Sequence, residues 1–275
     1  MKTMLMLCLV FFATTVSASR PYYPDSTLEK FSSDNSTPDE LREEIFNLST
    51  KFHIKHNDSN DTLSDICPDK EKCEIQKLTF DYKQARQIMF GELFLENHGN
   101  GKYSVKDAYC NINIDETMGA GPDKIPNPKY MNCEHTWPQS KFSKTFSADL
   151  QKTDLHHLFP ADMRANSTRN NFPFADVDGK ATHSNCLDSK IGNATGSDIR
   201  SFEPPIEHKG NVARAIYYFS TRYKMNIDAT QAKYLKIWNA EDPVDQEELL
   251  RNEKIMKLQG NRNPFIDYPE LVNRL

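Results

Sequence analysis

The sequence predicts an α+β protein: a mostly helical single domain that is interrupted in its middle by a small mixed segment. Apolar residues recur at helical spacing in two stretches near the N-terminus and again through the C-terminal third. Between them, residues 102–205 carry short apolar patches among Pro, Gly, Asn and Asp, which is typical of short strands and long loops. With 275 residues, 37% of them hydrophobic, the chain is large enough to bury such a core.

The first 18 residues predict a cleaved signal peptide. Lys2 supplies the positive start, residues 5–13 supply the apolar stretch, and residues 16–18 (Val-Ser-Ala) form a small-residue cleavage site. A retained membrane anchor is the alternative, although the apolar run is short, and no later stretch reaches the ~20 apolar residues of a membrane span. We therefore expect a secreted product, in the extracellular space or the lumen of the secretory or digestive pathway, without membrane association.

The folded part is expected to begin with a helix at Thr37. Residues 19–36 lack periodicity and predict a flexible lead-in, so the domain is assigned to residues 37–275. Thr37 is placed to cap the helix, Pro38 fits its first turn, and Glu40 can reach back to complete a capping box. An apolar stripe follows at Leu41, Ile45, Leu48 and Phe52.

Further helices are predicted on both sides of the mixed segment. Residues 82–94 place Tyr82, Ala85, Met89 and Leu93 on one face, and residues 97–101 supply turn residues after them. Three helices are expected in the C-terminal third, the last of which starts at Asp242-Pro243 and stops at Gly260. Their apolar positions are Val212, Ala215, Ile216, Phe219 and Tyr223, then Tyr234, Leu235 and Trp238, then Leu249, Leu250, Ile255 and Leu258.

The cysteines and the sequons fit an oxidising compartment. Cys67 and Cys73 could close a short local loop, and Cys110, Cys133 and Cys186 could supply one longer bridge and one odd thiol. A zinc site is the rival interpretation, but the chain has no C-x-x-C pair. The N-x-S/T sequons indicate a glycoprotein or, equally, chance in an Asn-rich chain; they lie at Asn35, Asn47, Asn57, Asn60, Asn166 and Asn193.

Residues that suit phosphodiester hydrolysis gather between positions 133 and 171. Glu134 and Asn166 offer hard oxygens, which suit Mg²⁺ first, with Ca²⁺ or Mn²⁺ as alternatives to it. His135 can accept a proton from water near neutral pH. A base, a hard metal and nearby arginines are what this reaction requires, because the base generates the nucleophile and the metal stabilises charge on the phosphate and the departing oxygen.

These residues resemble the endonuclease I family of secreted and periplasmic nucleases, whose active site is a ββα-metal (His-Me finger) motif. The resemblance is carried by E-H-x-W-P-Q-S at 134–140, D-L-H-H-L-x-P at 154–160 and N-S-x-R-x-N at 166–171. Segments at 202–205, 209–214 and 259–265 match the family in the same order. The resemblance spans roughly residues 40–270 and implies a ββα-metal core at about 130–175.

The resemblance implies a role for each matching residue. His135 would be the general base at the end of a strand, and Glu134 and Asn166 would be the metal ligands. Neighbouring strand residues point to opposite faces, so Glu134 and His135 can serve one site only where the strand bends or ends, as Pro138 allows. Three supporting residues would orient this site: Asp154, His156 and His157.

The sequence departs from the family pattern at the residue that would neutralise the scissile phosphate. Some members carry an arginine between the histidine and the D-L-H-H segment, whereas residues 138–153 contain lysines and no arginine. Arg169 is the preferred substitute, with Arg164 second. Because the formal net charge is −5, nucleic acid must be bound by a local basic patch, for which the candidates are Arg169, Lys209, Arg214, Arg222 and Arg262.

The sequence thus predicts a secreted, monomeric, metal-dependent endonuclease that cuts DNA, and also RNA, with little sequence preference and leaves 5′-phosphates. The alternative is a non-catalytic secreted protein that binds nucleic acid through a nuclease-like fold. A zinc protease is disfavoured because no H-E-x-x-H motif occurs. The sequon at Asn166 is expected to stay unmodified, because a glycan on a metal ligand would block the site.

Overall fold

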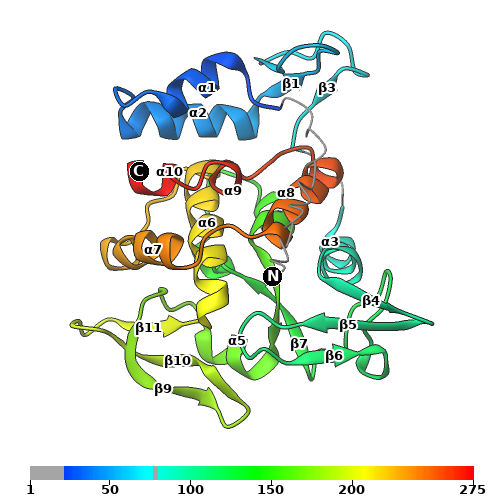
Figure 1. Cartoon of the computed structure of the whole chain (residues 1–275), viewed down its shortest axis with the longest axis vertical. Helices are drawn as coiled ribbons and strands as arrows, with labels where there is room; N and C mark the ends of the chain where they lie inside the picture. The colour runs from blue at the N-terminus through cyan, green and yellow to red at the C-terminus, as the bar shows by residue number, and fades with distance from the viewer. Residues whose placement is uncertain (1–21, 77–79) are drawn as a thin grey trace, which may run out of the picture.

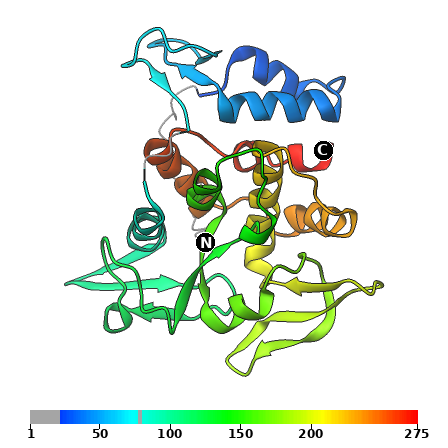
Figure 2. The same cartoon turned by 180° about the vertical axis from the view of Figure 1, so that it is seen from behind.

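The computed structural model of the chain describes residues 22–76 and 80–275, so the predicted signal peptide and the start of the lead-in lie outside the described residues. The fold is α+β, and the described residues form helices and four small antiparallel sheets. Helix α6 (Ile206–Arg222) runs through the middle of the molecule (Figure 1). Two of the sheets lie beside one end of α6, and the first two helices lie at the other, which the reverse view also shows (Figure 2).

The N-terminal part contains α1 (Asp25–Ser32) and α2 (Pro38–Thr50). The capping box predicted at Thr37 is confirmed: the Thr37 hydroxyl accepts a hydrogen bond from the Glu40 N–H at 3.3 Å, and the Glu40 carboxylate accepts one from the Thr37 N–H at 2.8 Å. Helix α1 differs from the flexible lead-in expected for residues 19–36. Its Phe31 is buried against Tyr268 near the C-terminus, a contact that local sequence periodicity cannot reveal.

The helix predicted over residues 82–94 consists of α3 (Tyr82–Ile88) and a π-helical turn, η1 (Met89–Leu93). The turn expected at 97–101 is different in detail. Strand β4 (Leu95–Gly99) follows the helix directly, and the tight turn lies at Gly99–Gly101, where the chain enters β5 (Lys102–Lys106). Pairing with β5 satisfies the backbone of this polar stretch, so it forms a hairpin rather than a loop.

The mixed segment predicted at 102–205 contains the short strands that were expected, and short helices lie where long loops were expected. One sheet has the order β4-β5-β6 and another the order β11-β10-β9, while β7 and β8 form a separate pair. The elements are β6 (Asn113–Asp115), η2 (Glu116–Met118), β7 (Met131–His135), η3 (Gln139–Lys141), α4 (Ala148–Thr153), η4 (Leu155–His157), β8 (Leu158–Asp162), α5 (Met163–Arg169), β9 (Val177–His183), β10 (Cys186–Ala194) and β11 (Arg200–Glu203). Further toward the N-terminus, the sheet β2-β1-β3 is made of β1 (Phe52–Ile54), β2 (Thr62–Ser64) and β3 (Cys73–Glu74).

The three predicted C-terminal helices occur in the predicted order, with one corrected start, and are followed by two short helices that were not predicted. Besides α6 they are α7 (Ala229–Glu241), α8 (Gln246–Gln259), α9 (Pro264–Asp267) and α10 (Leu271–Arg274). Helix α8 does not start at Asp242-Pro243 but is capped by Asp245, because the Asp242 carboxylate is engaged with the Gly210 N–H at 2.7 Å. Gly260 ends α8 as predicted, with a φ of 92° that favours glycine.

Two disulfides confirm the cysteine prediction. Cys67 and Cys73 close a local loop, and Cys110 is bridged to Cys186, which leaves Cys133 as the odd thiol among the described residues. The core is centred on α6, which packs against α2, α7 and η4. In the part of the chain that the structure covers, no helix has the length and apolar character needed to cross a bilayer.

Candidate functional site

The candidate site is built on the hairpin of β7 and β8. Strand β7 ends at His135, and Glu134 and His135 pair with Phe159 and Leu158 of β8. Strand β7 thus ends at His135, as predicted, and the convergence of Glu134 and His135 on one site stays a prediction. Helix α5 begins directly after β8, where Asp162 accepts hydrogen bonds from the first-turn N–H groups, and it packs against both strands.

Glu134 is a buried carboxylate, 2% exposed, with two partners. Its Oε1 accepts a hydrogen bond from the Tyr109 hydroxyl at 2.8 Å and lies 3.4 Å from Nη1 of Arg169. Burial raises the pKa of the Glu134 carboxyl, and the Arg169 charge and the Tyr109 hydroxyl offset part of that rise. The environment thus holds a carboxylate that one arginine only partly compensates.

Arg169 is buried as well, and its guanidinium is directed into the protein. Besides Glu134, it donates to the carbonyl oxygen of Thr136 at 2.6 Å and to that of Asn170 at 3.1 Å, and it lies over the Phe174 ring. Its side chain is 2% exposed. The direct contact to a phosphate that the sequence suggested stays a prediction.

Asn166 is carried by the same face of α5 as Arg169. Residues three apart on a helix lie on one side of it, and Arg169 reaches Glu134 from this side. Asn166 is half-buried, one turn nearer the start of α5. The fold thus brings Arg169 of α5 to Glu134 from some thirty positions later in the chain, whereas the approach of Asn166 to Glu134 stays a prediction.

His135 is held in one orientation by two hydrogen bonds. Its Nε2 lies 3.0 Å from the carbonyl oxygen of Lys152, and since a carbonyl only accepts, Nε2 carries the proton. The other nitrogen, Nδ1, then has the lone pair, to which the Gln139 amide donates at 3.2 Å. Burial lowers the pKa of His135 to about 3, with a further contribution from His157. The imidazole is therefore neutral near neutral pH, as a general base must be.

The three predicted supporting residues anchor the segment that follows Lys152. Asp154 accepts hydrogen bonds from the Tyr218 and Tyr223 hydroxyls at 3.0 and 2.8 Å. Nε2 of His156 lies 3.1 Å from the Asn261 carbonyl oxygen, and Nε2 of His157 lies 2.8 Å from that of Gln151. All three side chains are buried. They fix the backbone that presents the Lys152 carbonyl to His135.

A comparison with known protein families matches the part of the chain that carries this site. The profile of the family described as Endonuclease I matches residues 95–270, a range that contains all of the site residues above. The chain belongs to the endonuclease I family.

Curated relatives of this endonuclease I chain carry nuclease names. An extracellular ribonuclease of Bacillus amyloliquefaciens is 37% identical over 164 residues, which cover 52% of this chain and 53% of the relative. An extracellular deoxyribonuclease of Aeromonas hydrophila is 33% identical over 138 residues, which cover 50% and 58%. The chain spans about half the length of the curated relatives it matches, so neither printed activity transfers to it without a test.

The basic residues predicted to bind nucleic acid in this endonuclease I chain lie in buried ion pairs. Lys209 contacts Asp176 and Glu203, Arg214 contacts Glu248, and Arg262 contacts Glu253 and Asp267. Each side chain is less than 10% exposed. A phosphate contact would require these pairs to open, so their role in binding stays a prediction that burial disfavours. Arg222 is likewise buried, with its Nε donating to Gln76.

Two residues at the site escaped the sequence analysis. Gln139 lies inside the motif at 134–140 but received no role, and its contact with His135 follows from the turn after Pro138. Tyr109 carries no local signal, because only the tertiary structure brings it to Glu134. Its position next to the disulfide-bonded Cys110 was the one available hint that the backbone there is fixed.

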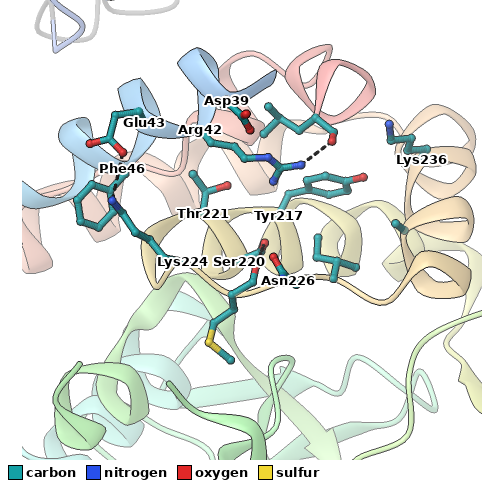
Figure 3. Close-up of a pocket in the computed structure, with 14 residues that line it drawn as sticks. Asp39, Arg42, Glu43, Phe46, Tyr217, Ser220, Thr221, Lys224, Asn226 and Lys236 are labelled. Atoms are coloured by element: carbon teal, nitrogen blue, oxygen red, sulfur yellow. Dashed lines mark hydrogen bonds and ion pairs between the residues drawn. The ribbon is translucent and has the colours of Figure 1, made fainter. Parts of the chain in front are cut away.

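Two other features do not belong to this site. Cys110, Cys186 and His183 lie close together, but the two sulfurs are joined in a disulfide and so are not thiolate ligands. A cavity of about 640 Å³ lies between α2, α6 and α7, where Arg42, Tyr217 and Lys236 line it (Figure 3). It contains none of the residues that the sequence motifs single out.

Proposed function

We propose that this chain is a secreted, metal-dependent endonuclease that hydrolyses phosphodiester bonds of DNA and RNA without sequence preference and leaves 5′-phosphates. One observation carries the proposal: a buried, incompletely compensated carboxylate and a neutral, oriented imidazole stand side by side at the end of β7. The names of the ribonuclease and deoxyribonuclease relatives support both substrates.

The metal is proposed to bind between Glu134 and Asn166, with β7, β8 and α5 forming the ββα-metal unit. A carboxylate and an amide oxygen are hard donors, which suit Mg²⁺, Ca²⁺ or Mn²⁺ better than a soft ion. The buried Glu134 fits a cation because Arg169 alone leaves the pKa of its carboxyl raised. When bound, such an ion would stabilise negative charge on the phosphate and on the leaving oxygen.

His135 is proposed to activate the attacking water through Nδ1. The Gln139 amide must leave Nδ1 before water can bind there, and as an exposed side chain it is free to rotate. When Nδ1 takes the proton, the imidazole becomes positive, and the Lys152 carbonyl oxygen at Nε2 stabilises that charge. Asp154, His156 and His157 act indirectly, because they hold the segment that carries this carbonyl.

Arg169 is proposed to favour the ionised form of Glu134. Its guanidinium lies 3.4 Å from Oε1, and its remaining hydrogen bonds fix it to the backbone on either side of the site. The Tyr109 hydroxyl donates a hydrogen bond to the same oxygen and so limits the rotation of the Glu134 carboxylate. Both are positioning residues in this proposal; a direct contact of Arg169 with the phosphate would be in addition to it.

Secretion is proposed from independent features. Disulfides such as Cys110–Cys186 persist in oxidising compartments, and the relatives named above are called extracellular. The predicted cleavable signal peptide and the sequons agree with that route. We also propose a monomer that leaves the Asn166 sequon without a glycan, and peptide mapping that found sugar on Asn166 would contradict its role as a ligand.

The test is a nuclease assay on plasmid DNA and on RNA, with Mg²⁺, with EDTA, and with Mg²⁺ restored after EDTA. We expect cleavage that EDTA stops and Mg²⁺ restores. His135→Ala should abolish turnover and keep the wild-type circular dichroism spectrum, while the control His98→Ala, which removes a half-exposed histidine of β4, should keep full activity. Full activity of His135→Ala would refute the base. Retardation of DNA without cleavage in Mg²⁺ would favour the non-catalytic alternative.

A further inference from the structure

A pocket lined by basic and acidic side chains lies at the opposite end of the β7–β8 hairpin from His135. Its volume is about 240 Å³, several times the ~30 Å³ of one water molecule and enough for a phosphate group. Three basic side chains from three different elements line it: Lys129 from the loop before β7, Arg164 from α5 and His183 from β9. We call this the Lys129–Arg164 pocket.

The acidic residues of the pocket are already occupied. The Asp107 carboxylate accepts hydrogen bonds from four backbone N–H groups, those of Tyr109, Cys110, Ile112 and Asp162. Asp162 caps α5 and contacts His183 at 3.0 Å. By contrast, Lys129 and Arg164 are exposed, and neither side chain has an ion pair or a hydrogen bond with any residue in the ranges 22–76 and 80–275. These two charges are therefore free to meet an anion.

The pocket is placed to continue a strand that starts at the candidate site. Met131, at its edge, is three residues before Glu134 on β7, which corresponds to about 10 Å along the strand, a distance that a nucleic-acid strand of a few nucleotides can cover. Arg164 lies two residues before the candidate ligand Asn166 on α5. Tyr130, 48% exposed at the rim, is held by a hydrogen bond from the Met163 N–H to its carbonyl oxygen and offers a ring on which a base can stack.

We propose that the Lys129–Arg164 pocket is a subsite for the substrate strand: Lys129 and Arg164 bind one backbone phosphate, and Tyr130 stacks on the adjoining base. This inference rests on the proposed nuclease function and locates the basic patch that a chain of net charge −5 needs. In this proposal the Lys129–Arg164 pocket binds the strand, whereas the buried Lys209, Arg214 and Arg262 do not. Because the contacts are to phosphate and to a ring face, they read no sequence.

The first experiment measures binding without cleavage. A fluorescein-labelled 20-nucleotide single strand is titrated in EDTA with His135→Ala protein that also carries Lys129→Ala and Arg164→Ala. We expect Kd to rise about tenfold at 0.1 M salt and the slope of log Kd against log salt to fall by about 0.7, since the two side chains share one phosphate contact and each such contact contributes about 0.7. The control Lys254→Ala/Lys257→Ala removes the same charge from α8 and should leave Kd within twofold.

Stacking is tested separately. Tyr130→Ala should weaken binding about fivefold, whereas Tyr130→Phe keeps the ring and should bind within twofold of the parent. An unchanged Kd and salt slope in the Lys129→Ala/Arg164→Ala protein would overturn the subsite. So would an equal loss in the α8 control, because it would show that only overall charge matters.

A kinetic comparison separates this inference from the proposed function. With His135 intact and Mg²⁺ present, the Lys129→Ala/Arg164→Ala variant should raise KM for a 20-nucleotide strand about tenfold. The Lys129→Ala single variant, which keeps Arg164, should leave kcat unchanged and cleave a two-nucleotide substrate, whose one internucleotide phosphate is the scissile one, at the wild-type rate. Loss of the two-nucleotide rate would overturn the subsite. If the wild-type chain cleaves no nucleic acid at all, the proposed function fails, and the binding titration still decides whether the pocket holds a strand.

Discussion

Removal of the Arg169 charge should destabilise the fold, because it leaves the Glu134 carboxylate buried without its cation. At the 3.4 Å that separates Nη1 from Oε1, the Coulomb attraction at an effective dielectric constant of 20 is about 5 kcal/mol. Arg169→Met should therefore lower the free energy of unfolding by about 3–5 kcal/mol. The loss lies toward the lower value if Glu134 takes up a proton, because a neutral carboxyl needs no cation. Glu134→Gln should cost less, since the amide oxygen still accepts from Tyr109.

The assay is a double-mutant cycle of Arg169→Met and Glu134→Gln, measured by urea unfolding at pH 7.5. We expect a coupling energy of about 2–3 kcal/mol between the two sites. The exposed pair Glu43–Lys224, with its charged groups 3.1 Å apart, is the matched control and should give less than about 1 kcal/mol. A coupling below about 0.5 kcal/mol for Arg169 and Glu134 would refute the reasoning, because it would mean that the pair does not compensate the carboxylate.

Three further predictions address stability and the site. Burial lowers the pKa of His208 from 6.5 to about 3, so below pH 6.5 the unfolded state binds more protons than the folded state, and the free energy of unfolding falls as the pH drops. At pH 5 this one group lowers the free energy of unfolding by about 2 kcal/mol, and urea unfolding at pH 5 should show that His208→Phe recovers this loss relative to wild type. Tyr109→Phe should lower metal-dependent turnover about tenfold or more through Glu134 while the circular dichroism spectrum stays unchanged, and wild-type turnover would contradict the positioning role. Replacing both Cys110 and Cys186 by Ala should cost about 4–5 kcal/mol, since the bridge spans 76 residues; a loss under 1 kcal/mol in urea would show that the loop is ordered without it.

Local signals in the sequence predicted several of the longer helices and some of their ends. The capping box at Thr37 and the glycine stop at Gly260 depend on residues within one turn of each helix end, so they can be seen without the fold. Helix α1 and the start of α8 could not be predicted in this way. Phe31 is buried by a ring from near the C-terminus, and Asp242 is taken up by the N–H of Gly210 from another helix.

In the candidate site, some residues could be predicted from local motifs, whereas their contacts depend on the tertiary structure. Motif spacing singled out Glu134, His135 and Asn166, and the end of β7 at His135 agrees with the strand end that these neighbours required. The orientation of His135 depends on the Lys152 carbonyl, which comes from the segment after α4 and leaves no mark in the motif. Tyr109 reaches Glu134 from 25 positions away, beyond any local pattern.

By itself, the sequence determined the family, the candidate site residues and the ends of some helices, because these follow from residue types at short spacing. Only the tertiary structure decided which charges are free. The sequence alone does not distinguish the basic residues Lys209 and Arg164, yet Lys209 is buried between two carboxylates and Arg164 is exposed beside a pocket. Whether a charge is solvated or paired depends on residues brought together from far apart, and that is a property of the packing alone.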